Sequence, residues 1–472
     1  MKTKAFIAII LAALMLLCGC GVTEQPPIAA PTAEPTAVPN PTQQAAHHEH
    51  EGYLIAQPVS HEYAKDPDTL VDETGEAEDM DRYTELRDDW LKQLDARRSA
   101  AEAAPDMRAF TEALFEQIVK NSEGGNLIFS PANIYMALAM LAESTDGQTR
   151  AEILSALDAK DMDELRANAA ALMKAEPVDD GVSKCGIANS LWLNDKFGFN
   201  TDTLERVAEV YEGSSYWGDP NDPDFTLALR DWLNANTGNM LEQSVAGVEL
   251  PPELVVAIAS AIYFKAAWDD EYYKERTDRM SFHTPEGDID ADFMHKDVTG
   301  HYYKGEGFSA YREQLKNGAG CMWFLLPDEG SGVTEMMNGA GMGFIFGDKT
   351  GMENTEIKVH VSMPKLDVKS ETMLESALQG MGVTSCFGNE ADFSPLISGT
   401  DVSVSSVLHV ARVKTDEDGV EAAAFTLLYC GAAMPLPPEE EVDFVLDRPF
   451  VFVITGQSEA PLFMGVVNTP NN

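Results

Sequence analysis

The stretch DEDGVEAAAFTLLYCGAAMPLPPEEE, Asp416 to Glu441, lies near the end of a chain of 472 residues. Acidic residues flank a run of alanines and other small or apolar residues, and prolines precede the second acidic group. This composition suits neither a stable helix end nor a buried parallel strand. It predicts a long exposed segment late in a large protein, and the residues on either side indicate which fold presents it.

Segments with the periodicity of helices occupy the first third of the folded region, and strand-like segments rich in Val, Ile, Phe and Trp dominate the last third. This distribution predicts an α+β fold with large, mainly antiparallel sheets. The helical segments are Asp106–Asn121 and Ser130–Leu157, with start and stop signals at Ser130-Pro131 and Asp146-Gly147. The strand-like segments are Cys185–Asn194, Leu254–Trp268, Cys321–Pro327, Glu356–Ser370 and Arg448–Asn468.

The charge of the chain restricts its partners. The formal net charge is −45, and 44% of the residues are hydrophobic, which is enough for a sizeable core. Nucleic acid and anionic lipid would both be repelled by such a surface, so we expect neither as a partner. Six cysteines in a chain of this length form no disulfide framework.

Motifs of common enzyme classes are missing from the sequence. There is no Gly-x-Ser-x-Gly, no phosphate-binding Gly-x-x-x-x-Gly-Lys-Ser/Thr, no His-Glu-x-x-His and no Cys-x-x-Cys. A histidine-rich tract could in principle hold a transition metal, but it lies in an acidic segment without a folded second shell, so we expect no metal site. Its members are His47, His48, His50 and His61. We therefore expect no enzyme, no catalytic residue and no cofactor.

The chain begins with the features of an export signal. A basic start precedes an apolar run, Ala5–Leu17, that is too short to span a bilayer. The following Leu17-Cys18-Gly19-Cys20 resembles the bacterial lipobox, which implies a lipoprotein signal peptide over 1–19 and a lipid anchor on Cys20. An ordinary signal peptide that happens to end in cysteines is the alternative. We expect the protein at the cell surface or outside the cell, anchored to the outer face of a bacterial membrane.

Three further regions follow the signal. Residues 20–75 are rich in proline and acidic residues and predict an extended, unfolded tether. Residues 76–104 predict a short amphipathic helix, either docked on the body or free, with Trp90, Leu91 and Leu94 clustered. We expect the folded domain over 105–472.

Five segments of this domain resemble the landmarks of the serpin family of serine protease inhibitors, in family order and at family spacing. They are Asn126–Leu154, Ala261–Trp268, Ala391–Leu396, Asp416–Thr426 and Arg448–Asn468. The resemblance implies that the stretch quoted above is a reactive-centre loop, cut by a serine protease that becomes trapped as an acyl-enzyme when the loop enters the central sheet as a new strand. It also implies that the loop hinge comprises Glu417, Gly419, Val420, Glu421, Ala422, Ala423 and Ala424.

The loop sequence has the alternating pattern that insertion as a buried strand requires. Counting from Val420, alternate residues are uncharged and no bulkier than leucine: Val420, Ala422, Ala424, Thr426, Leu428, Cys430 and Ala432. Because successive strand residues point to opposite faces, this set could face the core. The other set carries Glu421 and Phe425, and Phe425 replaces a residue that is small in most of the family.

The resemblance assigns two more groups of residues. The polar positions beneath the central sheet, called the shutter, correspond to Ser130, Asn133, Ser260 and His409, with serine and asparagine exchanged at two of them. The reactive bond falls at Ala433-Met434 by counting from the hinge glycine, whereas counting backward from the C-terminal side points near Leu436-Pro437, a bond disfavoured by its proline. There is no Lys or Arg from Asp416 to Asp447, which argues against trypsin-like targets.

The sequence thus predicts a monomeric inhibitor that traps elastase-like or subtilisin-like serine proteases, with small or apolar specificity pockets. Two alternatives stay open. One is a serpin that does not inhibit or that acts on cysteine proteases, and Phe425 is the residue that favours it. The other is an unrecognised hydrolase or binding module.

Overall fold

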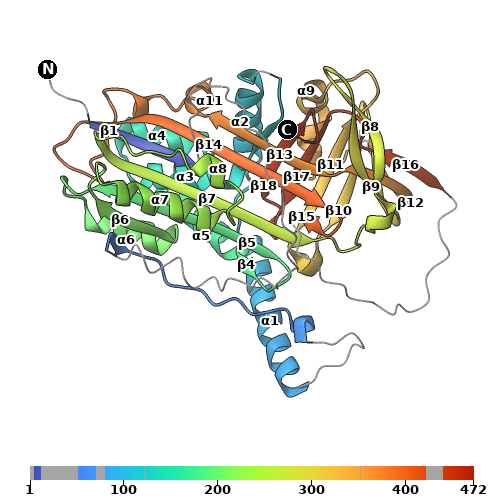
Figure 1. The fold of residues 1–472 in the computed structure, drawn as a ribbon. Helices are drawn as coiled ribbons and strands as arrows, with labels where there is room; N and C mark the ends of the chain where they lie inside the picture. Colours follow the sequence, from blue (N-terminus) through green and yellow to red (C-terminus); the bar gives the residue numbers. More distant parts are fainter. Residues whose placement is uncertain are drawn as a thin grey trace, which may run out of the picture.

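The computed structural model describes residues 5–11, 52–70, 80–122, 124–350, 352–420 and 440–471. Two nine-stranded sheets and surrounding helices form the body (Figure 1). This is the expected α+β fold with large, mainly antiparallel sheets. Its helices are α1 Met80–Ala101, α2 Arg108–Lys120, α3 Pro131–Glu143, α4 Gly147–Ala156, α5 Met162–Ala175, α6 Thr201–Val210, α7 Pro223–Asn236, α8 Glu242–Val245, α9 Val333–Met336, α10 Met342–Ile345 and α11 Glu375–Gly380.

The central sheet runs in the order β2-β6-β5-β7-β14-β13, with two short segments, β1 and β15, between β7 and β14, and with β4 paired to β5. The strands of this sheet are β1 Ala5–Leu11, β2 Leu54–Ala56, β4 Val178–Asp179, β5 Lys184–Asn194, β6 Gly213–Gly218, β7 Leu254–Ala267, β13 Leu366–Met373, β14 Val402–Asp416 and β15 Gly419–Val420.

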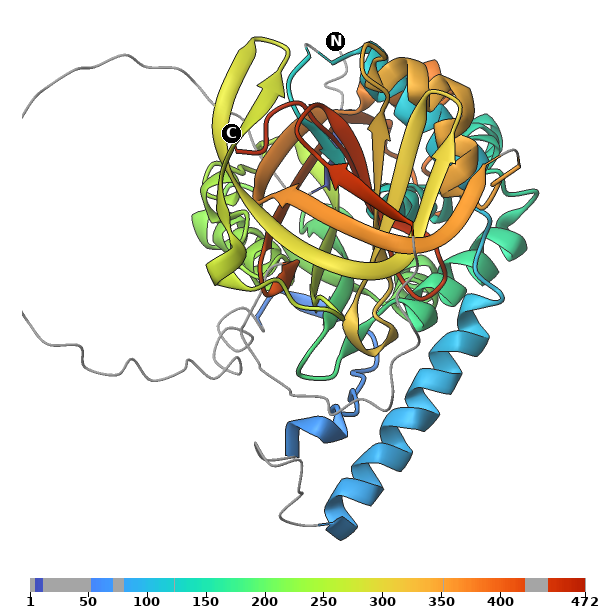
Figure 2. The same ribbon diagram turned by 90° about the vertical axis from the view of Figure 1, so that its right-hand side faces the viewer.

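The second sheet runs in the order β16-β12-β9-β10-β11-β17-β18-β3, and β8 pairs with β9. Figure 2 shows how its long strands curve around the end of the body. Its strands are β3 Leu127–Phe129, β8 Asp278–Thr284, β9 Gly287–Gly305, β10 Phe308–Gln314, β11 Cys321–Pro327, β12 Glu353–Pro364, β16 Glu441–Val445, β17 Phe450–Thr455 and β18 Pro461–Val467.

The strand-like segment Glu356–Ser370 divides between the two sheets. Its first part belongs to β12 in the second sheet, and its last part to β13 in the central sheet. Pro364 ends β12, and the backbone N–H of the next residue, Lys365, donates to the carbonyl of Asp292 in the partner strand β9 at 2.8 Å. Proline cannot donate a ladder hydrogen bond, so the chain changes sheets at this point.

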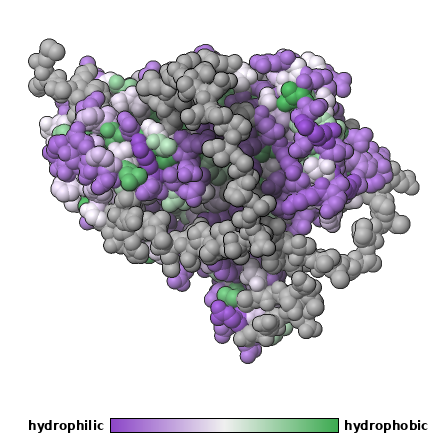
Figure 3. Space-filling model, viewed as in Figure 1, coloured by the Kyte–Doolittle hydropathy of each residue, from purple (hydrophilic) through white to green (hydrophobic). Residues whose placement is uncertain are grey.

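The central sheet is covered on both faces. On one face lies α3, whose side chains are all buried. Its first turn is set by Pro131 and by the N-cap Ser130, whose hydroxyl accepts from the backbone N–H of Asn133 at 3.1 Å. On the opposite face, α7 and α8 bury an apolar cluster that includes Phe225 and Ala259. Figure 3 shows a surface on which hydrophilic residues predominate among those coloured, in keeping with the net charge of −45.

The region before the domain is docked on the body. Strand β2 adds to the free edge of β6, and the Lys65 ammonium contacts the Asp179 carboxylate at 2.9 Å. Helix α1 packs along α5, and the Arg97 guanidinium donates to the carbonyl of Ala175 at 3.0 Å. Helix α1, which lies within the segment 76–104 expected to be helical, therefore packs against the domain, with Leu94 as its buried contact.

Candidate functional site

The site begins where the chain leaves β14 and turns back. Gly419 and Val420 form β15, which lies between β14 and β7 and pairs with both. Val420 is opposite Thr415 on one side and Ala266 on the other, and its side chain is buried. Gly419 and Val420, two of the hinge residues predicted from the sequence, are thus already part of the central sheet.

Gly419 is required at this position for two reasons. Its φ of 154° belongs to a region that residues with side chains rarely adopt. A Cβ atom added here would also lie 2.3 Å from the carbonyl oxygen of Ala266. A side chain would therefore push the hinge away from β7.

The turn before β15 is anchored by polar contacts. Glu417 is 3% exposed, and its carboxylate accepts from the Lys365 ammonium and from the Thr277 hydroxyl, both at 2.7 Å. Burial alone would raise the pKa of Glu417, but the hydrogen bonds from these partners hold it below its usual value. The indole of the fully buried Trp268 donates to the carbonyl of Asp416 at 2.8 Å. These contacts fix the point at which the loop departs.

Beyond Val420 the two flanking strands are separated. Residues 260–265 of β7 and 410–414 of β14 have no described strand between them, although each strand pairs normally on its other side. A cavity of about 30 Å³ lies there, lined among others by Ile262, Phe264, Ala411 and Val420. Among the described residues, no strand pairs with these two stretches on the sides that face each other, so a strand entering between them could take up their backbone hydrogen bonds.

The structure brings the four shutter residues together beneath this gap. The Asn133 amide donates to the Ser260 hydroxyl at 2.8 Å, and the Ser130 backbone N–H donates to His409 Nε2 at 3.0 Å. The exchange of serine and asparagine therefore leaves the polar cluster connected. The Ser260 hydroxyl in turn donates to Asn189 of β5 at 2.8 Å, a fifth member that sequence reasoning missed.

His409 is held neutral. Its side chain is 1% exposed, and burial lowers its pKa to about 3. Since Nε2 accepts a hydrogen bond, the proton sits on Nδ1, which has no hydrogen-bond partner among the described residues. A buried N–H without an acceptor costs free energy, so this group would gain from any acceptor that enters the gap.

The part of the gap between residues 254–259 of β7 and 402–409 of β14 holds a segment that sequence reasoning did not place there. Ala5–Leu11, within the apolar run assigned to a signal peptide, forms β1 and pairs in parallel with both β14 and β7. Its register runs up to Leu11 opposite His409. The halves of β7 and β14 that lie away from β15 therefore have an added strand between them (Figure 1).

Several predicted site residues lie outside the described residues. These are the hinge residues Glu421, Ala422, Ala423 and Ala424, the bond Ala433-Met434 and the proposed lipid site Cys20. Among the histidines considered for a metal, only His61 is described, and it contacts Glu212 at 3.2 Å. No group of three or more potential metal ligands occurs in the part of the chain that was placed.

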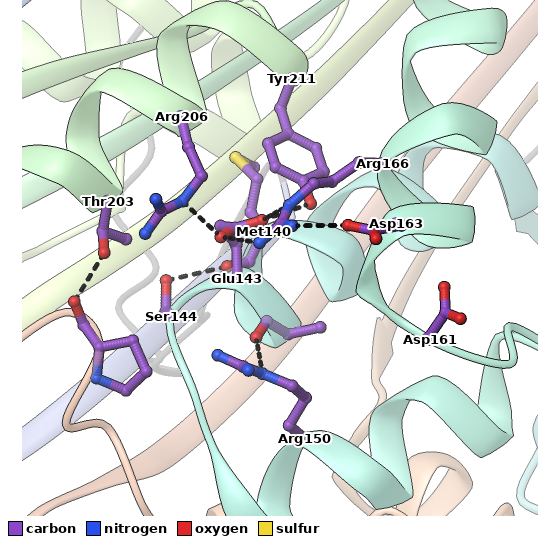
Figure 4. A network of polar contacts seen from close by, with 12 residues as sticks. Met140, Glu143, Ser144, Arg150, Asp161, Asp163, Arg166, Thr203, Arg206 and Tyr211 are labelled. Atoms are coloured by element: carbon purple, nitrogen blue, oxygen red, sulfur yellow. Dashed lines mark hydrogen bonds and ion pairs between the residues drawn. The ribbon is translucent and has the colours of Figure 1, made fainter.

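A buried carboxylate at the end of α3 was also missed. Glu143 is 1% exposed and is gripped by the Arg166 guanidinium at 2.8 and 2.9 Å, by Arg206 at 2.9 Å and by the Tyr211 hydroxyl at 3.1 Å (Figure 4). Burial would raise the pKa of Glu143, but these partners bring it below its usual value. The cluster joins α3, α5 and α6 and is structural, since it lies away from the gap.

Comparison with known proteins identifies the family. The profile described as "Serpin (serine protease inhibitor)" matches residues 105–470. The chain therefore belongs to the serpin family, whose members are typically protease inhibitors rather than enzymes. The match begins at the residue where the folded domain was predicted to start.

Relatives and a solved structure agree with this assignment. The chain is 28% identical to Antichymotrypsin-2 of Bombyx mori over 378 residues, covering 76% of this chain and 95% of that protein. It is 27% identical to Antitrypsin of Bombyx mori over 366 residues, covering 73% and 88%. The crystal structure of the thermophilic serpin tengpin in its native state superposes with a TM-score of 0.67 at 26% identity, covering 77% and 93%.

Proposed function

We propose that this serpin is a single-use inhibitor that traps a serine protease of elastase-like or subtilisin-like specificity as a covalent acyl complex. One observation carries the proposal: Gly419 and Val420 already pair between β7 and β14, and beyond them no described strand lies between residues 260–265 of β7 and 410–414 of β14. The hinge is thus placed to lead the rest of the loop into the sheet.

The register of β15 assigns a place to each loop residue on insertion. If the antiparallel pairing continued from Val420, Ala424 would fall between Ala411 and Ile262, and Thr426 would fall between His409 and Ser260. Val420 and Ala266 belong to one buried hydrophobic cluster, and Thr415, opposite Val420, is buried as well. The uncharged alternate set that begins at Val420 would therefore face the core, as its composition requires.

The chemistry of the trap follows from ordinary acyl transfer. The protease serine oxygen attacks the carbonyl carbon of Ala433, an ester forms, and the amine of Met434 leaves with the proton. Water would normally hydrolyse that ester. Insertion of the loop up to the acylated residue would drag the protease to the far end of the sheet before hydrolysis occurs. The absence of Lys and Arg from Asp416 to Asp447 favours small or apolar pockets over trypsin-like ones.

A second candidate is a serpin that does not inhibit serine proteases or that acts on cysteine proteases. If the loop inserted in the register of β15, Phe425 would come between Val410 and Ala261, two residues of the apolar cluster beneath α7. A phenyl ring there would have to displace packed side chains, which costs free energy and slows insertion. If insertion is slower than hydrolysis of the acyl-enzyme ester, the protease is released active and the serpin is left cleaved and inactive.

We further propose that Cys20 carries a lipid and anchors the protein at the outer face of a bacterial membrane. The support is the Leu17-Cys18-Gly19-Cys20 sequence and the proline-rich segment that follows it. None of the described helices is long and apolar enough to cross a bilayer. Cleavage before Cys20 would also remove β1 and so leave the space that β1 occupies between β7 and β14 free for the loop. In a bacterial host, Cys20→Ala should move the protein out of the membrane fraction, and a wild type found only in the soluble fraction would contradict the anchor.

Incubation with elastase tests the inhibitory function. We expect an SDS-resistant complex whose mass is that of the protease plus the serpin minus the C-terminal fragment, and mass spectrometry should locate that fragment's start at Met434 or within a residue or two. Cleavage in the loop without a complex would favour the second candidate. Resistance of the whole loop to elastase and subtilisin would contradict both the target class and the bait assignment.

A further inference from the structure

A larger cavity lies between the docked N-terminal region and the central sheet. Its volume is about 430 Å³, and its walls come from residues 57–63, which follow β2, from β5 and β6, and from one side of α7. It shares no lining residue with the 30 Å³ cavity between β7 and β14. Sites for small molecules usually have volumes of roughly 300–1,000 Å³, so this cavity has room for such a ligand.

Aromatic side chains from three parts of the chain line this cavity. Trp232 belongs to α7, Tyr216 to β6 and Tyr63 to the docked segment. Trp232 is 8% exposed, and the Tyr216 ring stacks on the buried Trp192 with 4.2 Å between the ring centroids. The Tyr216 ring is thus held in place, and aromatic surface of this kind binds apolar groups and attracts cations.

The charged residues of the lining favour a cation. Glu212 and Asp231 supply carboxylates, whereas no Lys or Arg lies among the described residues that line the cavity. An anion would meet both carboxylates and a chain with a net charge of −45. A positively charged group is therefore the ligand that complements the cavity.

Glu212 occupies an unusual backbone position in this lining. Its φ is 49°, a left-handed conformation that residues other than Gly, Asn and Asp adopt uncommonly. Such conformations cost free energy and occur often at functional sites. A glutamate at a position where glycine or asparagine would fit the backbone better therefore indicates a role for its carboxylate.

The Glu212 carboxylate is only partly satisfied. Its Oε1 contacts His61 Nε2 at 3.2 Å, and its other oxygen has no hydrogen bond from the described residues. Burial raises the pKa of Glu212 above its usual value, against the opposing effect of His61 and Lys174. Burial and the charge of Glu212 also raise the pKa of Tyr63 to about 12. A carboxylate that has lost this much hydration would gain from a second cationic partner.

We propose that the cavity binds a small organic cation with an apolar group, with its ammonium or amidinium at the Glu212 carboxylate and its apolar group against Trp232 and Tyr216. The inference goes beyond the proposed inhibition and does not depend on it, because the cavity is separate from the gap between β7 and β14. Residues 57–63 form one wall, so a bound ligand contacts both the docked segment and the body. Binding should therefore strengthen the docking of this segment.

Calorimetric titration of the full chain with 2-phenylethylamine tests the site. We expect saturable binding that is roughly tenfold or more tighter than that of the uncharged 2-phenylethanol, because hydrogen bonds to charged groups are the stronger ones. The anion 3-phenylpropanoate should not bind. No saturable binding of the amine, equal binding of the amine and the alcohol, or binding of the anion would overturn the proposal. The comparison uses the wild type throughout, so it does not depend on whether a variant folds.

Two variants locate the bound cation. Glu212→Gln removes the carboxylate and should weaken binding of the amine to about that of the alcohol. The matched control is Glu209→Gln, which removes the same charge from an exposed position of α6 outside the lining and should leave binding unchanged. Equal weakening by both changes would mean that the net charge alone attracts the amine, and the site would be wrongly assigned.

Hydrogen exchange gives a structural readout of the same binding. With the amine at about ten times its dissociation constant, amides of β2 and of residues 57–63 that exchange when the segment is released should exchange roughly tenfold more slowly. Amides of α4, which contributes no lining residue, should exchange as before. Unchanged exchange of the segment at saturation would place the ligand elsewhere and contradict the proposal.

Discussion

The Lys365 ammonium lies 2.7 Å from the Glu417 carboxylate and joins the start of β13 to the turn that leads into the reactive loop. Glu417 is almost fully buried, whereas the Lys365 side chain is 34% exposed. The pair therefore closes the end of the central sheet at which β15 enters. We expect this ion pair to affect both the free energy of unfolding and the position at which the loop leaves the sheet.

We expect Glu417→Gln to lower the free energy of unfolding by about 1–3 kcal/mol, because it leaves Lys365 without its partner at a partly buried site. A double-mutant cycle with Lys365→Gln should show coupling, measured by urea unfolding. Additive effects of the two changes would mean that the pair does not hold the sheet end. Since the pKa of Glu417 lies below its usual value, its contribution is present above pH 4.5 and is lost as the pH falls through the lowered pKa.

The alternation of the hinge predicts opposite outcomes for neighbouring alanines. Ala424→Glu would bury an unpaired charge against Ala411 on insertion, at a cost of several kcal/mol, and should turn the inhibitor into a substrate. Ala423→Glu is the matched control, because that residue would lie on the opposite face beside Arg412. Titration of active elastase against each variant gives the stoichiometry of inhibition. Full inhibition by Ala424→Glu would show that the loop does not insert in this register.

Thr426 is predicted to satisfy the buried Nδ1–H of His409. On insertion in the register of β15, this threonine would lie between His409 and Ser260, where its hydroxyl could accept the missing hydrogen bond. Thr426→Val keeps the shape but removes the acceptor, so we expect the ratio of cleaved to complexed serpin to rise about two- to tenfold, whereas Thr426→Ser should stay near wild type. Equal ratios for valine and serine would contradict this role.

The contribution of Glu143 to the free energy of unfolding should depend on pH in the acidic range. Glu143→Gln leaves Arg166 and Arg206 without their buried partner, and we expect a loss of about 2–4 kcal/mol at pH 7. Because the pKa of Glu143 is lowered, that difference should diminish as the pH falls from about 4.5 through the lowered value. Asp163→Asn, which removes an exposed partner of Arg166 at 3.3 Å, should cost less than about 0.5 kcal/mol. A difference at pH 7 that persists unchanged at pH 3 would contradict the assignment.

The fold could be predicted because local sequence patterns determine it: Ser130-Pro131 marks the start of α3, and apolar runs mark β7 and β17. The positions Ser130, Asn133, Ser260 and His409 came from the resemblance to the family, and hydrogen bonds connect them in the structure. The Glu143 cluster could not be predicted, because Arg166 and Arg206 lie 23 and 63 residues away and only the packing of α3, α5 and α6 brings them together. The same holds for Asn189, for the docking of β2 on β6, and for β1, whose apolar run equally suits a signal peptide.

Thermal unfolding before and after cleavage of the loop tests the central claim most directly. The claim is that the gap between β7 and β14 takes up the loop once the chain is cut. A dozen new ladder hydrogen bonds and the buried side chains would contribute on the order of ten kcal/mol, so the cleaved form should unfold roughly 20 °C or more above the intact form. Intact and cleaved forms that unfold at the same temperature would show that no insertion occurs, and the trapping mechanism would be excluded.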